Sequence, residues 1–160
     1  MVVILGIVGV SAVPVLSQSA EATRAASKDE VVRFFEYARS RAMSAGKPVG
    51  VRIDTAESLL GVVSIDESGS IETISDLISS GAMQVNLPSE YAGASVQSFT
   101  NGNAQQGNGI VWFDYQGVPH IRDDSSGAFV SMSNQNAALL LSSGVSVEVH
   151  AHTGFVREVR

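Results

Sequence analysis

The pattern of hydrophobic and polar positions divides the chain into a helical part and a strand-rich part. Val2 to Leu16 is an uncharged, mostly apolar run, and apolar residues then recur at three- and four-residue steps as far as Ala45. This spacing predicts one long amphipathic helix. Gly46, followed by Pro48, gives its stop signal. The stripe that we expect to pack against the rest of the chain consists of Val31, Phe34, Phe35, Ala38, Ala42 and Met43.

One sequence feature offers an alternative to a single uninterrupted helix. Ser27 to Glu30 reads Ser-Lys-Asp-Glu, which matches a capping box at the start of a helix. A break near Ser27 would therefore give two shorter helices. We favour one rod.

After Pro48 the apolar residues alternate with polar ones, which predicts half-buried strands. Turn signals separate most of them, including Asp66 to Gly69, Tyr115 to Gly117 and Asp123 to Gly127. The fold class is therefore predicted to be α+β, with a long N-terminal helix packed on an antiparallel β-sheet domain. The expected parts are an apolar segment 1–16, an amphipathic continuation 17–46 and a β-rich domain 48–160. The expected strands are 49–54, 59–65, 83–87, 95–99, 110–113, 118–121, 129–132, 145–150 and 155–159.

Composition and charge exclude several classes of function. The 160 residues include 23 serines and 22 valines, and none is cysteine, which excludes disulfides, thiolate metal sites and a cysteine nucleophile. The net charge is −6. Residues 17–47 carry six cations and four anions, whereas residues from Pro48 onward carry four cations and twelve anions. The predicted sheet domain is thus a poor ligand for nucleic acid.

The apolar run at the N-terminus is predicted to act in a membrane and in helix assembly. As a helix it would be about 22 Å long, which is too short to span a hydrocarbon core of about 30 Å alone. Small residues such as Gly6, Gly9 and Ala12 would let helices approach closely. A buried core helix is the alternative. The residues of this segment that we expect to matter most are Val2, Val3, Ile4, Leu5, Gly6, Ile7, Val8, Gly9, Val10 and Pro14.

A candidate metal site lies near the C-terminus. Glu148, His150 and His152 would share one face of an extended strand, and histidine nitrogens bind zinc well. Their outer pair would be about 13 Å apart, however, so a solvent-facing strand end is the preferred interpretation. His120 with Asp123 and Asp124 could add ligands, and the two aspartates could hold calcium, but the Asp-Asp-Ser-Ser-Gly sequence is typical of a turn. We therefore expect no metal and no cofactor.

Two further sets of residues have a structural interpretation beside a functional one. Arg157 and Arg160 could contact DNA, but two arginines on an acidic domain are weak evidence for a DNA-binding surface. Trp112, Phe113 and Tyr115 are interpreted as the core and edge of a central strand, with a ligand-stacking platform as the alternative. The polar stretch 101–109 is expected to be a mobile loop. No sequence motif of a nucleophilic or metal-dependent enzyme is present, so we expect no catalytic residues.

The layout as a whole resembles a known family. The apolar Val2 to Val8 segment, Pro14, the helix end Ala38-Arg-Ser-Arg-Ala42, the stretch Val111 to Gly117 and the closing Thr153-Gly-Phe-Val-Arg157 resemble type IV pilin-like proteins. More narrowly, they are similar to the minor pseudopilins of type II secretion, of the GspH and FimT kind. The helix part of the resemblance is fairly specific, and the strand motifs are degenerate.

The resemblance implies a structural, non-enzymatic role. Members of the family are cleaved and methylated by a prepilin peptidase and pack helix against helix in a short periplasmic fibre. The implied location is the inner membrane, crossed once, with the β domain in the periplasm. The implied partners are other pilin-like subunits, an inner-membrane assembly platform and membrane lipid. Secretion, pilus and DNA-uptake systems share this layout, and the residues do not choose between them.

One departure from the family concerns the start of the chain. Family members carry a basic leader ending in glycine, then a phenylalanine and, a few residues later, a glutamate. None of these precedes Val2. We expect Met1 to be an internal methionine or the result of truncation, in which case the preceding residues would extend the apolar run to spanning length. If Met1 is the true start, processing by the peptidase is in doubt.

Overall fold

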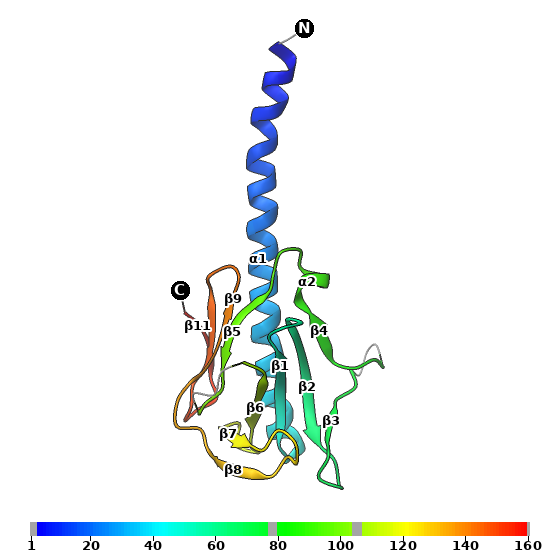
Figure 1. The fold of residues 1–160 in the computed structure, drawn as a ribbon, viewed down its shortest axis with the longest axis vertical. Coiled ribbons are helices and arrows are strands. Elements are labelled where there is room, and N and C mark those ends of the chain that lie inside the picture. The colour runs from blue at the N-terminus through cyan, green and yellow to red at the C-terminus, as the bar shows by residue number, and fades with distance from the viewer. Residues whose placement is uncertain (1–2, 77–79, 104–106, 160) are drawn as a thin grey trace.

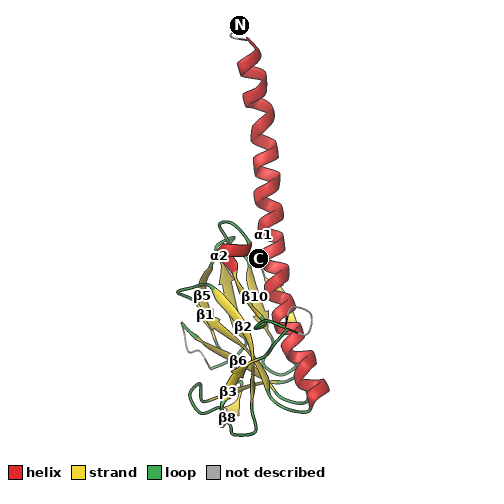
Figure 2. Cartoon of the chain, turned by 90° about the vertical axis from the view of Figure 1, so that its right-hand side faces the viewer, coloured by secondary structure: helices red, strands yellow, loops and turns green. Residues whose placement is uncertain are grey.

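The fold combines one long helix with two antiparallel sheets (Figures 1 and 2). The computed structural model describes residues 3–76, 80–103 and 107–159, with side chains from Glu21 onward. Helix α1 (Val3–Ala45) has 43 residues and would be about 65 Å long. Both sheets pack beside its C-terminal half, and its N-terminal half projects beyond them. The predicted α+β class is confirmed.

The strands form a larger and a smaller sheet. The larger runs in the order β3-β2-β1-β6-β7-β8, and β4 also pairs with β2. The smaller runs in the order β11-β10-β9-β5, and all pairs in both sheets are antiparallel. The bounds are β1 Val49–Asp54, β2 Leu59–Ile65, β3 Ile71–Thr73, β4 Gln84–Asn86, β5 Val96–Thr100, β6 Gly109–Phe113, β7 Pro119–Arg122, β8 Phe129–Met132, β9 Ala137–Leu141, β10 Ser146–Val149, β11 Val156–Val159, and a short helix α2, Leu87–Glu90.

Helix α1 is continuous through Ser27, where a break was the alternative. The Ser27 hydroxyl donates to the carbonyl of Arg24, 2.9 Å away, so it bonds back along the helix instead of capping a new one. The helix ends at Ala45. Gly46 follows with φ of 65°, and its N–H donates to the Ala42 carbonyl at 3.0 Å. This left-handed residue is the predicted stop.

The apolar stripe of α1 lies in the main core, between the two sheets. Val31, Phe34, Phe35, Ala38 and Ala42 are each at most 1% exposed. They belong to one buried cluster with inward-facing residues of β1, β2 and β6 from the larger sheet and of β9 and β10 from the smaller. The prediction that Met43 shares this stripe is wrong, because Met43 is 49% exposed. It is one position past Ala42, which turns it about 100° away from the buried face.

A second, smaller core covers the outer face of the larger sheet. Val63, Ile110 and Trp112 are buried there, with Ile65 and Ile71 packed against them. No side chain fits at Gly50, because a Cβ would lie 2.7 Å from Ile110 Cγ2. Trp112 is thus a core residue, as interpreted. Phe113 is also fully buried, whereas Tyr115 lies in the following turn and is 62% exposed.

Several strand predictions need correction. Strands β3 and β9 were not predicted, and β10 ends at Val149, before His150. The Ala-Ala-Leu-Leu-Leu sequence of β9 lacks clear alternation, although its burial does alternate. In the predicted loop 101–109, Asn101 and Gly102 are buried, and the Gly102 carbonyl accepts the N–H groups of Asn134 and Gln135, both at 3.1 Å. Residues 104–106 of that loop lie outside the described part.

Both sheets are tied to the helix at one point, which we call the Arg39 clasp and which consists of Arg39, Gly117, Gly154 and Phe155. Arg39 Nε donates to the Gly117 carbonyl at 3.2 Å, in the turn between β6 and β7. The Arg39 guanidinium carbon lies 4.6 Å from the centre of the Phe155 ring, just before β11. Gly154 has φ of 66°, and a Cβ there would lie 1.9 Å from the Gly117 carbonyl oxygen. The clasp therefore requires glycine at position 154.

Replacement of Gly154 by alanine is expected to destabilise the fold strongly. Gly144 is the matched control, because its φ is 79° but nothing lies within 4 Å of its Cβ position. Gly144→Ala should lower the free energy of unfolding by about 1 kcal/mol through backbone strain alone. Gly154→Ala should lower it by roughly 3 kcal/mol, because the turn at Gly117 must also move. Urea denaturation measures both, and equal losses would contradict the clasp.

Candidate functional site

The principal candidate site is the part of α1 that the sheets leave uncovered. The half of the helix that begins at Val3 projects away from the β domain, whereas the half that ends at Ala45 lies along both sheets (Figures 1 and 2). The predicted segment Val2–Leu16 falls in the projecting half, although Val2 lies outside the described residues. Over its described residues, α1 contains no stretch both long and apolar enough to cross a membrane. The helix thus offers a free surface beyond the domain it anchors.

Charged side chains mark the place where α1 leaves the β domain. Lys28 Nζ lies 2.9 Å from Glu158 Oε2 of β11 and 3.1 Å from Asp29 Oδ1. Hydrogen bonds to these two carboxylates raise the pKa of Lys28. One helical turn further on, Arg33 pairs with Glu30. Such partly exposed pairs contribute little to stability. Of the three pairs, Lys28–Glu158 joins the helix to β11, and the other two lie within α1.

The structure does not assemble the candidate metal site of Glu148, His150 and His152. The premise of one shared strand is wrong, because β10 ends at Val149 and both histidines lie in the turn that follows. Glu148 Oε2 instead accepts from Arg157 Nη2 at 2.7 Å. His150 Nδ1 accepts the N–H of His152 at 3.3 Å. Among the described residues, no three histidine, aspartate or glutamate side chains are grouped so as to hold a metal.

Asp123 closes a turn instead of forming a calcium site with Asp124. Asp123 Oδ1 accepts from the backbone N–H and the hydroxyl of both Ser125 and Ser126, at 2.5–3.1 Å. The two hydroxyl bonds are the main cause that lowers the pKa of Asp123 to about 2. For Asp124, partial burial and the neighbouring Asp123 raise the pKa. The Asp-Asp-Ser-Ser-Gly sequence therefore forms a turn, which was the preferred interpretation of this sequence.

His120 is a buried, neutral side chain of the β-sheet. It is 2% exposed, and its Nε2 accepts from Arg122 Nε at 2.7 Å. Burial, followed by the charge of Arg122, lowers its pKa to about 4. Arg122 also donates to the Gly127 carbonyl at 2.6 Å. His120 is thus part of a fixed hydrogen-bonded chain and not an open metal ligand.

The candidate DNA contacts are not presented as a basic surface. Arg157 Nε and Nη2 both bond Glu148 Oε2, at 3.1 and 2.7 Å, so its charge is paired across β10 and β11. Arg160 lies outside the described residues. Phosphate binding would have to displace Glu148 and would act against the acidic surroundings.

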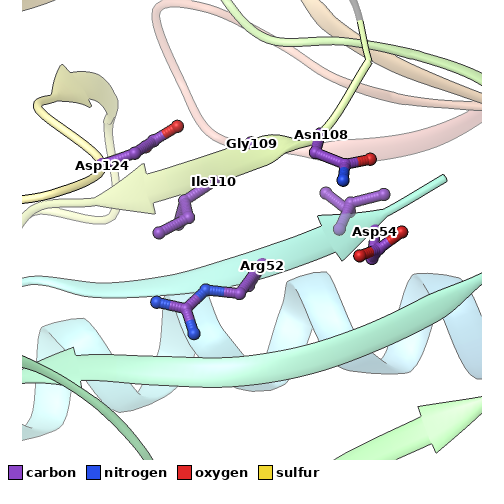
Figure 3. A pocket seen from close by; sticks show the side chains of 7 residues that line it. Arg52, Asp54, Asn108, Gly109, Ile110 and Asp124 are labelled. Atoms are coloured by element: carbon purple, nitrogen blue, oxygen red, sulfur yellow. The ribbon is translucent and has the colours of Figure 1, made fainter. Parts of the chain in front are cut away.

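A shallow pocket of about 250 Å³ opens where β1 ends and β6 begins (Figure 3). Arg52 and Asp54 come from β1, Asn108 precedes β6, and Asp124 comes from the loop after β7. Asp54 Oδ1 accepts the N–H groups of Ala56 and Glu57, and Asn108 Oδ1 accepts from Thr55. Asp54 therefore serves its own turn, and Asn108 ties the start of β6 to that same turn. These bonds engage two of the pocket's four polar side chains in the fold.

The sequence did not distinguish the exposed strand β8 from the others. Phe129–Met132 was predicted as a strand with no statement on its burial, and all four of its residues are exposed. An alternating pattern identifies a strand but does not say whether another layer covers it.

The buried His120 should make stability depend on pH. Its pKa is about 4 in the folded chain against an ordinary value of 6.5, so the folded state binds fewer protons between these values and stability falls as pH falls. Between pH 6.5 and 4 the wild type should lose on the order of 3 kcal/mol more than His120→Gln, which keeps an acceptor for Arg122. Urea denaturation across this range checks it, and parallel curves for the two proteins would refute it.

Comparisons with known proteins identify the fold. No protein-family profile and no curated protein sequence matches the chain. Two structures of the minor pseudopilin EpsH from the type 2 secretion system of Vibrio cholerae are similar. One has a TM-score of 0.55 and 13% identity over 86% of this chain and 95% of that one, and the other a TM-score of 0.57 and 12% identity over 82% and 89%. The type IV minor pilin FimU of Pseudomonas aeruginosa has a TM-score of 0.51 and 12% identity over 84% and 91%. The chain therefore has the pilin-like fold of these minor pseudopilins and minor pilins.

Proposed function

We propose that the chain is a minor pilin-like subunit of a type II secretion or type IV pilus machine. Its role is structural: it takes part in a short periplasmic fibre through its helix and performs no catalysis. The observation that carries this proposal is the division of α1, whose C-terminal half is buried in the β domain while its other half projects free. The fold shared with EpsH and FimU supports the same role.

The free half of α1 has a composition suited to packing against other helices. The run from Val3 to Leu16 contains no charge, and Gly6, Gly9 and Ala12 recur at three-residue steps. Small residues let two backbones approach closely where lipid gives no hydrophobic driving force between helices. We infer that this segment contacts other pilin-like subunits and membrane lipid. The orientation that follows is an inner-membrane helix with the β domain in the periplasm.

Three further parts of the proposal follow from the family role. An inner-membrane assembly platform would receive the subunit, and a prepilin peptidase would cleave and methylate it if a leader precedes Met1. The chain would act alongside other subunits of similar fold. The paired Arg157 and the unassembled Glu148, His150 and His152 give no support to DNA uptake or to a metal-dependent role as the main function.

Cysteine cross-linking in the cells that make the protein tests this role. The chain has no cysteine of its own, so single substitutions report one position each. Ala22→Cys places a thiol on the exposed surface of α1, near the point where its free half meets the β domain. A membrane-permeable maleimide–diazirine reagent attached to this thiol and activated by light needs no thiol on the partner. It should join this variant to other pilin-like subunits in the membrane fraction, because assembly brings the helices together.

Ala56→Cys is the matched control, since Ala56 is also exposed but lies in the turn between β1 and β2. It should give few such products at the same reagent concentration. The proposal fails if Ala22→Cys gives no cross-linked product, or if the protein is absent from the membrane fraction.

A further inference from the structure

Large exposed apolar side chains gather at one end of the β domain. Tyr115 is 62% exposed, Phe129 57%, Val130 59% and Met132 48%. We call these four residues the β8 surface, because three of them belong to β8 and Tyr115 lines the same pocket as Phe129 and Met132. Apolar groups concentrated in this way on a protein surface usually mark an interaction site.

The β8 surface is hollowed and could receive a side chain. Pro48, Tyr115, Phe129 and Met132 line an apolar pocket of about 360 Å³, together with Asp114 at its polar side. Strand pairing places Met132 opposite His120 and Phe129 opposite Arg122, and the His120 and Phe129 ring centres are 5.8 Å apart. The buried His120 and the partly buried Arg122 also line the pocket, and the hydrogen bond between them fixes this part of it before any partner binds.

Strand β8 is also an edge strand of the larger sheet and carries no charge. The same is true of β4, which pairs with β2, and of β5 at an edge of the smaller sheet, but neither presents a cluster of large exposed apolar side chains. The opposite edge of that sheet, β3, includes Glu72, and β11 at an edge of the smaller sheet includes Arg157 and Glu158. Charged residues protect an edge from pairing or docking. The edge at β8 has only a register shift at Val130, which leaves that side chain exposed.

Acidic side chains flank the β8 surface. Asp114 lines the pocket, and Asp123 lies in the loop that leads to β8. Arg122, the cation among the pocket's lining residues, already donates to Gly127 and His120. His120 is neutral at pH 7, since burial keeps its pKa at about 4. A partner that places cations beside an apolar side chain would therefore complement this surface.

We propose that the β8 surface docks a neighbouring subunit of the fibre, through a segment in which apolar side chains stand next to lysine or arginine. That the partner is another subunit rests on the proposed function. That its docking segment is apolar and basic rests on the pocket and on the charges around it. β8 lies at the end of the β domain farthest from the N-terminus (Figures 1 and 2). If the free helix halves pack in parallel, this end faces along the fibre toward the next subunit.

A labelled peptide tests the docking chemistry on the full 160-residue chain. The probe is a fluorescein-labelled heptapeptide that alternates lysine and leucine, compared with versions that carry glutamate or serine in place of lysine. Fluorescence anisotropy should show that the chain binds the lysine peptide at least about fivefold more tightly than the other two, because only that peptide complements the acidic surroundings.

Two variants locate the binding site. Met132→Gln should weaken binding of the lysine peptide about fivefold, since it removes an apolar wall of the pocket. Met43→Gln is the matched control, because Met43 is 49% exposed and Met132 48%, but Met43 lies on α1. It should change binding less than about twofold, and it also corrects for peptide held by the apolar helix segment.

Four results would overturn the proposal: no binding to the wild type, equal binding of the three peptides, equal weakening by Met43→Gln, or a dimer of the chain that Met132→Gln dissociates. The last result would assign the β8 surface to a second copy. None of these readouts depends on helix assembly, so the proposed function can fail or stand independently through the Ala22→Cys cross-link.

Discussion

The burial of one helix stripe between two sheets is the contact on which the rest of the structure depends. Val31, Phe34 and Phe35 lie against strands of both sheets, so neither sheet has a complete core without α1. This burial accounts for half of the helix, and the other half projects beyond the two sheets. A helix anchored in this way keeps a fixed orientation relative to the β domain. Its free half can contact other subunits without disturbing that domain.

The Arg39 clasp gives a structural reason for three of the short sequence motifs on which the family resemblance rested. The helix end around Arg39, the turn at Gly117 and the turn at Gly154 are far apart in sequence and were the segments on which the family resemblance rested. In the structure they meet at one point, where the approach of the Gly117 carbonyl leaves no room for a Cβ at position 154. These residues therefore preserve the angle between helix and sheets, and no chemical role needs to be assigned to them.

The sequence predicted the parts of the fold that have a strong local signal. Helix periodicity, Gly46 and the alternating strands such as β1 and β2 placed most elements correctly. β9 was missed because three consecutive leucines hide its alternation, and His150 was placed on a strand because the sequence does not reveal where β10 stops. The exposure of β8 and the meeting of Arg39 with Gly154 depend on long-range packing, which a local pattern does not contain.

The functional account joins these observations: a rigid junction holds the β domain on one half of α1, and the other half is free for neighbouring subunits. Electron cryomicroscopy of a fibre containing the chain tests this most directly. The account predicts that the N-terminal halves of α1 pack together in the fibre centre and the β domains lie outside, with the Arg39 clasp unchanged. A fibre held together by the β domains alone, with the helix halves apart, would contradict it.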